Sequence, residues 1–483
     1  MRTFIVTLLA CLSASLLNAQ QWIDKKYTYT TQTDLVYGTA VNFNGGVDTL
    51  KMDVFLPVCD DNGGQNLRPL LMWIHGGAFL AGDKNDVSIQ NLCKEFAKRG
   101  YVTASIDYRL GFVSDDVLWQ CNYPNYSCVF ASDSAEWVRA YYRAVQDAKG
   151  ALRYLVNRSN TYHIDANNLF VAGESAGAFT ALGVALMDTL SEKPSQTLAL
   201  PDAPLPHVGT WTCGHNVGKS FSGNGITRPD LGGIDGTIEP STVPFTIKGI
   251  GNMYGAMYAN LLRDIPANKP RPAIYSFHQP CDIVVPIDSN VVYWGLSWCF
   301  TNGYNCMAIA NNQMKLYGSR AFSNWNSQNN LGYTIQNEFT AVNFPFSYLF
   351  GQGSCTDQVN NPCHAYDNAS LRENNLANFF AGLVTTNPAC DTTTLSLSSE
   401  ALNALIRISP NPATDYLNVR TEQVSVSKLQ LSNLTGQVCL HIDAKGSKDI
   451  RLDLRQIPDG LYYLSATTSQ GQVLTTKVLK QKR

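Results

Sequence analysis

The hydrophobic pattern of the chain changes near residue 390. Before that point, short continuous apolar runs alternate with longer stretches rich in Ala, Leu and Met, as expected for buried strands connected by helices. After it, short segments of alternating apolar and polar residues follow one another, separated by Gly, Asn and Asp turns. We therefore predict an α/β domain with a doubly wound, mostly parallel sheet, followed by a small all-β sandwich.

The same pattern predicts individual elements and a domain boundary. The expected strands of the first part are residues 69–74, 168–172, 245–250 and 272–277, and the expected helices are residues 178–190 and 370–380. In the second part, the alternating runs are residues 416–419, 428–431, 450–454 and 461–464. A Ser/Thr-rich linker at residues 391–404 separates a first domain at residues 22–390 from a second at residues 405–483.

The first 19 residues have the features of a signal peptide. They contain a basic Arg2, an apolar stretch at residues 4–17 and a small-residue cleavage site at residues 17–19. A second interpretation is a lipoprotein processing site, because Leu-Leu-Ala-Cys ends at Cys11. No later stretch approaches the ~20 apolar residues of a membrane-spanning helix, so we expect an exported chain with no transmembrane segment.

Chain length and charge bear on the number of domains and on the partners that the protein could bind. The 483 residues exceed the usual size of one domain, which agrees with two. Charged residues make up 15% of the chain and the formal net charge is −2. This balance gives no electrostatic reason to expect binding to nucleic acid or to an anionic membrane surface.

The most informative motif is Gly-Glu-Ser-Ala-Gly at residues 173–177. It lies between an expected strand and an expected helix, which is the setting of a nucleophile elbow. Glycines two residues before and after the serine let strand and helix approach each other closely. Ser175 is therefore the candidate nucleophile, and the backbone N–H of Ala176 is a candidate oxyanion donor.

A second glycine motif, His-Gly-Gly-Ala-Phe, follows the expected strand at residues 69–74. Two consecutive glycines leave backbone amides free to face a ligand, and Gly76 and Gly77 are the remaining candidates for an oxyanion hole. We expect the His75 side chain to support this loop from behind rather than to act as the base.

The order of the residues after Ser175 selects the other two members of a catalytic triad. In an elbow hydrolase the acid and then the histidine follow the serine. Asp282 lies just beyond the strand expected at residues 272–277, and His364 lies in a polar loop before the last helical pattern. We predict these two as acid and base; weaker substitutes for the acid are Asp288, Asp357 and Asp367.

These motifs together resemble the α/β-hydrolase superfamily, on the side of the carboxylesterases and lipases. The matching segments are residues 73–79, 106–112, 147–155 and 173–178. The resemblance implies a Ser175–His364–Asp282 triad, an oxyanion hole of backbone amides and an acyl-enzyme, with no cofactor and no metal. We expect Arg109 and Asp147 to stabilise the fold rather than to act on the substrate.

The last ~80 residues resemble the C-terminal sorting domain of the type IX secretion system. The segments that match are residues 408–413, 434–437, 458–464 and the basic end at 477–483. The resemblance implies that the secretion machinery binds this domain and that the protein, exported through the periplasm, is secreted or held at the cell surface. The alternative, a carbohydrate-binding sandwich, would expose a row of aromatic side chains.

The 13 cysteines fit an oxidising compartment. Closely spaced pairs that are candidates for disulfides are Cys121/Cys128, Cys299/Cys306 and Cys355/Cys363. A bond between Cys355 and Cys363 would brace the loop that carries His364. Cys213 and Cys281 are a further candidate pair, and sequence alone does not determine the connectivity.

Three functions remain open. The leading one is a secreted serine carboxylesterase that acts on small or plant-polysaccharide-derived esters. A lipase or polyester hydrolase is the alternative among enzymes, and a non-catalytic adhesion module is the alternative outside them. Long segments at residues 191–243 and 291–330 are either a cap that sets specificity or surface insertions.

Overall fold

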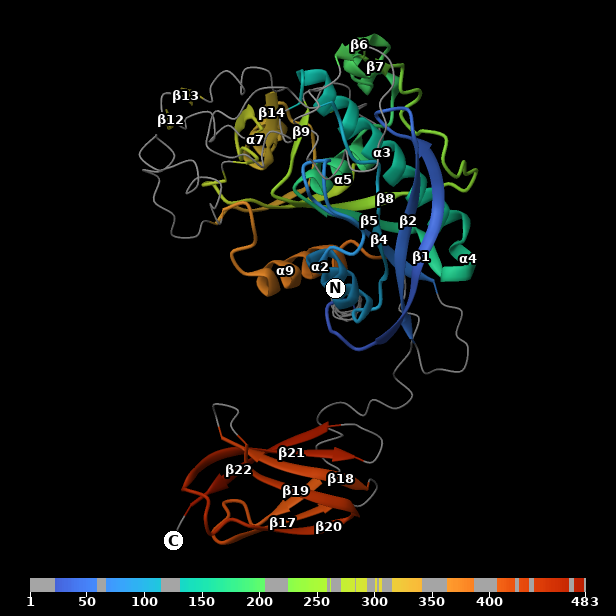
Figure 1. The fold of residues 1–483 in the computed structure, drawn as a ribbon. Helices are drawn as coiled ribbons and strands as arrows, with labels where there is room; N and C mark the ends of the chain where they lie inside the picture. Colours follow the sequence, from blue (N-terminus) through green and yellow to red (C-terminus); the bar gives the residue numbers. More distant parts are fainter. Residues whose placement is uncertain are drawn as a thin grey trace, which may run out of the picture. The chain divides into compact units, whose positions relative to one another are not determined.

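The computed structural model describes a large part of the chain. The described residues are 22–58, 67–113, 131–204, 225–258, 261, 271–282, 284–292, 300–301, 304–305, 315–340, 363–385, 406–421, 425–433, 438–468 and 473–481. The chain divides into two compact units, Met1–Cys390 and Asp391–Arg483 (Figure 1). The predicted signal peptide and the predicted linker lie outside the described residues.

An eight-stranded sheet forms the centre of the first unit. Its strand order is β1-β2-β4-β3-β5-β8-β10-β15. β2 pairs antiparallel with β1 and β4, and all other neighbours are parallel, which confirms the predicted α/β architecture. The strands are β1 (Thr28–Val41), β2 (Val47–Val58), β4 (Val102–Ile106), β3 (Arg68–Ile74), β5 (Ile164–Glu174), β8 (Ile247–Met253), β10 (Ala273–Phe277) and β15 (Ile335–Glu338).

Helices cover both faces of this sheet (Figure 1). α3 and α5 lie on one face, and α2 and α9 lie on the other. The helices are α2 (Val87–Ala97), α3 (Ser134–Asn157), α4 (Ser159–Tyr162), α5 (Ala176–Leu186), α7 (Ser319–Gln328) and α9 (Ala369–Ala381), with short 3₁₀ turns at η2 (Leu190–Glu192) and η3 (Ser195–Thr197). The strands and helices expected from the apolar runs are all present.

Strand β3 shows why a continuous apolar run is needed at the centre of the sheet. Leu70, Met72 and Ile74 point into the core under α3 and α5. Leu71 and Trp73 point into the opposite core under α2 and α9. Because side chains alternate along a strand, a strand buried on both faces requires apolar residues at every position.

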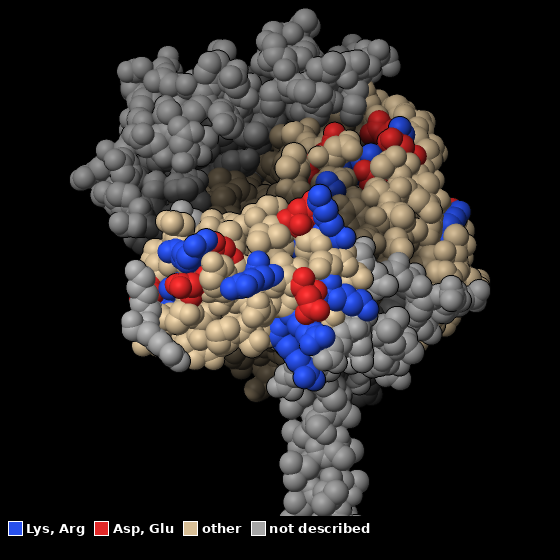
Figure 2. Space-filling view, turned by 90° about the horizontal axis from the view of Figure 1, so that it is seen from below, with Lys and Arg blue, Asp and Glu red and all other residues tan. Residues whose placement is uncertain are grey.

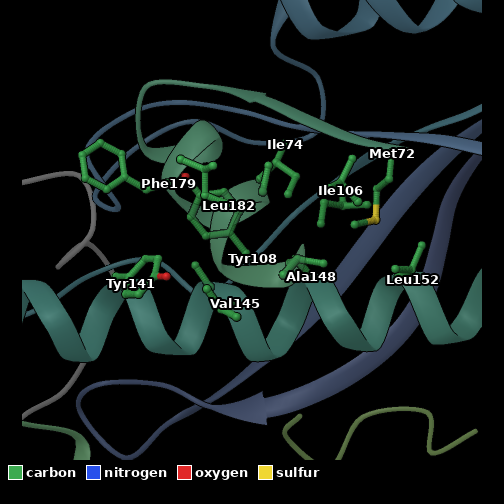
Figure 3. Close-up of a cluster of buried hydrophobic side chains, with 14 of the residues drawn as sticks. Met72, Ile74, Ile106, Tyr108, Tyr141, Val145, Ala148, Leu152, Phe179 and Leu182 are labelled. Atoms are coloured by element: carbon green, nitrogen blue, oxygen red, sulfur yellow. The ribbon is translucent and has the colours of Figure 1, made fainter. Parts of the chain in front are cut away.

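The face under α3 and α5 holds the larger core. Figure 3 shows Ile74 and Met72 of β3 above α3, whose Val145, Ala148 and Leu152 point toward the sheet. Each buried aliphatic side chain of this kind contributes about 1.5–3 kcal/mol through removal of its apolar surface from water. Leu182 of α5 belongs to the same core, so this packing also holds α5 against the sheet.

Smaller sheets lie outside the central one. They are β6 (Leu200–Pro204) with β7 (Gly225–Arg228), β12 (Phe300–Thr301) with β13 (Tyr304–Asn305), and the three strands β11 (Ser289–Val291), β14 (Lys315–Gly318) and β9 (Ala256–Tyr258). The described parts of both predicted insertions contribute to these sheets, to η2, η3 and α7, and to the irregular segment at residues 229–243.

The second unit consists of two antiparallel sheets that share one apolar core. One sheet has three strands and the other has four, as predicted for an all-β domain. The strands are β16 (Ile406–Ser409), β17 (Tyr416–Thr421) and β20 (Asp449–Asp453), then β19 (Val438–Ser447), β18 (Val426–Ser432), β21 (Gly460–Thr468) and β22 (Val473–Lys480).

Charges of both signs are mixed on the described part of one face of the molecule. On the face in Figure 2, basic and acidic side chains lie next to one another, and neither sign forms a patch of its own. Within the described residues, no helix combines the length and apolar character needed to cross a bilayer.

Candidate active site

Ser175 lies on a sharp turn between β5 and α5. Its backbone has φ 52° and ψ −121°, a left-handed conformation that is strained for a residue with a side chain. Gly177 makes the turn possible, because a Cβ atom there would lie 2.0 Å from the carbonyl oxygen of Ile74. The strand-to-helix turn predicted from the motif is therefore present, with Ser175 directly before the first residue of α5.

His364 lies between Ser175 and Asp282. Its Nε2 is 2.9 Å from Ser175 Oγ, and its Nδ1 is 2.8 Å from Asp282 Oδ2. An ionised carboxylate only accepts hydrogen bonds, so Nδ1 carries the proton and Nε2 is free to accept one from the serine. The structure thus brings together all three residues that the sequence suggested for a triad.

Asp282 is fully buried beyond the end of β10. Its Oδ1 accepts hydrogen bonds from the backbone N–H groups of Val284 and Val285, at 2.8 and 3.0 Å. Burial alone would raise the pKa of this carboxyl group, but His364 and His278 outweigh it and lower the pKa to about 2. Asp282 is therefore ionised at any pH at which the protein would work.

The His-Gly-Gly loop lies beside Ser175. The backbone N–H groups of Gly76, Gly77 and Ala176 have no protein acceptor among the described residues. All three residues line the same cavity as Ser175. Gly77 has φ 100°, and a Cβ there would meet a backbone oxygen at 2.1 Å, so this position requires glycine.

His75 supports the loop from behind, as predicted. Its ring stacks on Tyr108 with 4.3 Å between centroids, and the Tyr108 hydroxyl donates to the backbone oxygens of His75 and Gly76. Burial lowers the pKa of His75, so the ring stays neutral.

A cavity of about 610 Å³ opens above Ser175 and His364. Its walls are mostly apolar and aromatic, with Phe79, Trp137, Phe179 and Tyr258 among the largest side chains. From the second predicted insertion, Val292 and Leu316 reach the wall; none of the described residues of the first insertion does. Such a cavity suits an acyl or aryl group next to the serine.

Comparisons with known proteins place both parts of the chain next to known families. The BD-FAE family model matches residues 52–117 and 124–200, and the model described as "Secretion system C-terminal sorting domain" matches residues 407–481. The first region therefore contains an esterase-type α/β-hydrolase domain. The second is a sorting domain, which indicates export by a secretion system.

Curated relatives of the hydrolase domain are distant. Gut esterase 1 of Caenorhabditis elegans is 25% identical over 172 residues, which are 36% of this chain and 26% of the relative. Fumonisin B1 esterase of Sphingopyxis macrogoltabida is 28% identical over 148 residues, or 30% of this chain and 24% of the relative. The chain thus spans about a quarter of the length of these relatives.

Among solved structures, a truncated carbohydrate esterase from gut microbiota aligns with 74% of this chain and 96% of its own. Its sequence identity is 13% and the TM-score is 0.37. Esterase B from Lactobacillus rhamnosis, in complex with a tributyrin phosphonate, covers 78% of this chain and 96% of its own at 12% identity and a TM-score of 0.36.

A disulfide of the hydrolase domain corrects the sequence analysis. Cys281 is bonded to Cys363 across 82 positions of sequence. The predicted bond of Cys363 with Cys355 and the predicted bond of Cys281 with Cys213 are therefore both wrong. Proximity in sequence was a poor guide, because the fold brings the loop after β10 against the loop before α9.

His278 is a residue of the hydrolase domain that sequence reasoning missed. It is fully buried, and its Nε2 lies 3.1 Å from the backbone oxygen of Val285 and 3.3 Å from Asp282 Oδ2. Its Nδ1 lies 3.0 Å from the hydroxyl of Ser319. Its place four residues before the candidate acid, just after a strand, was the available signal.

Glu174 is a second buried group beside the nucleophile. It accepts a hydrogen bond of 2.8 Å from the Ser88 hydroxyl and reaches the cavity wall. Burial raises the pKa of this carboxyl group. Sequence reasoning treated it only as part of the motif.

Arg109 and Asp147 form a buried ion pair away from the cavity, with Asp147 also accepting the backbone N–H of Arg109 at 2.8 Å. Their predicted structural role is confirmed.

Among the described residues, no group of His, Cys, Asp and Glu side chains is arranged to hold a metal ion.

Proposed function

We propose that the hydrolase domain is a serine carboxylic ester hydrolase with Ser175 as nucleophile, His364 as general base and Asp282 as the acid that orients it. The observation that carries the proposal is the continuous hydrogen-bonded series from Asp282 through His364 to Ser175, which ends at the floor of an apolar cavity.

The first chemical step is attack by the serine. His364 Nε2 takes the proton from Ser175 Oγ as the oxygen attacks the ester carbonyl carbon. Asp282 holds the imidazole in the required tautomer through the 2.8 Å contact with Nδ1 and stabilises the imidazolium that forms. The imidazolium then gives its proton to the departing alcohol, which leaves an acyl group on Ser175.

Negative charge develops on the carbonyl oxygen during this step. The backbone N–H groups of Gly76, Gly77 and Ala176 line the cavity next to the serine and are the donors for that charge. One such donor is worth about 3 kcal/mol of the barrier. Because α5 begins at Ala176, the positive end of the helix dipole also favours the oxyanion.

Water completes the cycle. With His364 again acting as base, a water molecule attacks the acyl-enzyme and releases the carboxylic acid. Apart from the ester and this water molecule, the steps use only side chains and backbone amides of the chain.

The substrate class is small esters or esters derived from plant polysaccharide. The cavity of about 610 Å³ has room for an acetyl or an aromatic acyl group, and its aromatic walls favour the latter. The names of the curated relatives, among them gut and fumonisin B1 esterases, support ester hydrolysis as the reaction.

Export by the type IX machinery would take the enzyme to such substrates outside the cell. The sorting domain is the part that the machinery binds, and its removal releases the hydrolase domain or leaves it at the cell surface. The formal net charge of −2 gives no electrostatic reason to assign a nucleic acid or an anionic membrane as a partner.

The test is hydrolysis of p-nitrophenyl esters from acetate to palmitate by wild type, Ser175→Ala and Ser191→Ala. We expect Ser175→Ala to lose about 10⁴-fold or more in kcat, and Ser191→Ala, at an exposed position, to behave as wild type. Turnover that falls off beyond short chains supports an esterase, and a preference for palmitate supports a lipase. Equal activity of Ser175→Ala and wild type would overturn the proposal.

A further inference from the structure

The disulfide joins the two residues that directly precede members of the candidate triad. Cys281 comes just before Asp282, and Cys363 comes just before His364. The hydrogen bond between Asp282 and His364 therefore spans the same two loops, one residue further along each. A disulfide could lie closer in sequence to this contact only if it replaced Asp282 or His364 itself.

A second contact joins the same two loops, on the other side of His364 in sequence. The buried side chain of Gln279 donates a hydrogen bond of 2.8 Å to the backbone oxygen of Ala365. His364 is thus flanked in sequence by two residues that are linked to the Asp282 loop, Cys363 by a covalent bond and Ala365 by a hydrogen bond. The two loops are otherwise distant in sequence, because 82 positions separate the cysteines.

The acid and the base differ in how well the rest of the fold holds them. Asp282 is fixed by two backbone N–H groups and by His278, all within its own loop and fully or partly buried. The His364 side chain is 19% exposed. On the side of α9, its loop is held by Tyr366, which stacks on Phe277. The disulfide holds the other side.

We propose that the Cys281–Cys363 disulfide positions His364 against Asp282 and that its formation switches the hydrolase on. This inference rests on the proposed function of the site. In the reduced chain, the loop before His364 loses its covalent link to the Asp282 loop, and the imidazole spends less time aligned with Ser175. Activity then appears only where the two thiols are oxidised, which for an exported chain is after it leaves the cytoplasm.

The switching step is thiol–disulfide exchange with a small or protein disulfide as oxidant. The thiolate of one cysteine attacks the disulfide of the oxidant and releases one of its sulfurs as a thiol. The second cysteine then attacks the mixed disulfide, so the Cys281–Cys363 bond forms and the oxidant leaves as two thiols. Two electrons and two protons pass from the protein to the oxidant.

The first experiment compares the double variant Cys281→Ser/Cys363→Ser with wild type and with Cys93→Ala, which removes a buried cysteine that forms no disulfide. The readouts are kcat and KM for p-nitrophenyl acetate and the rate of labelling of Ser175 by a fluorophosphonate. We expect kcat and labelling to fall about 100-fold in the double variant, because small misplacements of a catalytic group have effects of that size. KM should change little, since neither cysteine lines the cavity.

The second experiment treats wild type with dithiothreitol and then with oxidised glutathione. Activity should fall and return in wild type and in Cys93→Ala, and the double variant should respond to neither reagent. Circular dichroism at the assay temperature shows whether each sample is folded. If the double variant is unfolded, the reduced wild type serves for the comparison.

The outcomes separate this inference from the function on which it rests. Oxidised wild type without esterase activity would overturn the proposed function. Active wild type with a folded double variant of equal kcat would overturn the inference alone. Loss of activity only together with global unfolding, in both the variant and the reduced wild type, would also overturn it, because the bond would then serve stability in general.

Discussion

The substitution Asp282→Asn tests the proposed mechanism at its most buried group. In the structure, Oδ1 of Asp282 accepts two backbone N–H groups and Oδ2 faces the two imidazoles. The oxygen of the asparagine amide must stay with the backbone N–H groups, so its NH₂ group takes the place of Oδ2. That group only donates, and His364 then has to accept at Nδ1 and carry its proton on Nε2.

An Nε2 that already carries a proton cannot accept one from Ser175. The loss expected from this wrong tautomer is about 10⁴-fold in kcat, or about 5.5 kcal/mol of the barrier. KM should stay within about threefold, because Asp282 is fully buried and is not among the described residues that line the cavity. The assay is steady-state hydrolysis of p-nitrophenyl acetate, with circular dichroism as the check on folding.

The matched variant is His278→Asn, which removes the second histidine and leaves the carboxylate with its bond to His364. We expect a decrease of only about tenfold, through looser positioning of Asp282. A folded Asp282→Asn enzyme with less than a tenfold loss would refute the mechanism. Equal losses of kcat in the two variants would show that the positioning of the Asp282 loop, rather than the tautomer of His364, controls kcat.

Three further predictions concern stability. Gly177→Ala should lower the free energy of unfolding by about 3 kcal/mol in a urea titration, because its Cβ would lie 2.0 Å from a backbone oxygen of Ile74; an unchanged midpoint would contradict this. Arg109→Ala should cost about 3–5 kcal/mol by the same measurement, since it leaves Asp147 buried without its partner, and a cost below about 1 kcal/mol would argue against the role given to this pair. The pKa of Asp282 is lowered from 3.8 to about 2 in the folded state. The ionised carboxylate therefore stabilises the folded state by about 2 kcal/mol above pH 4, and this contribution is lost as the pH falls toward 2. Asp282→Asn should therefore show a smaller fall in stability between pH 5 and pH 3 than wild type, and parallel curves would contradict the assigned pKa.

The parts of the structure that the sequence predicted are those that depend on local pattern. Leu70 to Ile74 have to be apolar at every position because β3 is buried on both faces, and this requirement is visible in the sequence. Gly177 is required by a backbone clash only two residues from the serine that it serves. Ser175, Asp282 and His364 could be chosen because each follows or precedes a recognisable strand or helix, in an order that the fold imposes.

The parts that the sequence did not predict depend on contacts between distant segments. The partner of Cys363 is 82 positions away, and only the path of the chain around the sheet brings Cys281 next to it. His278 lies four residues before Asp282 in sequence, but only the folded structure shows that its Nε2 is 3.3 Å from the carboxylate. These two features both act on the contact between Asp282 and His364. The order of residues in the sequence can therefore identify which residues react. How firmly those residues are held in place depends on tertiary structure. The disulfide and His278 variants test this directly, through the loss of kcat that each causes.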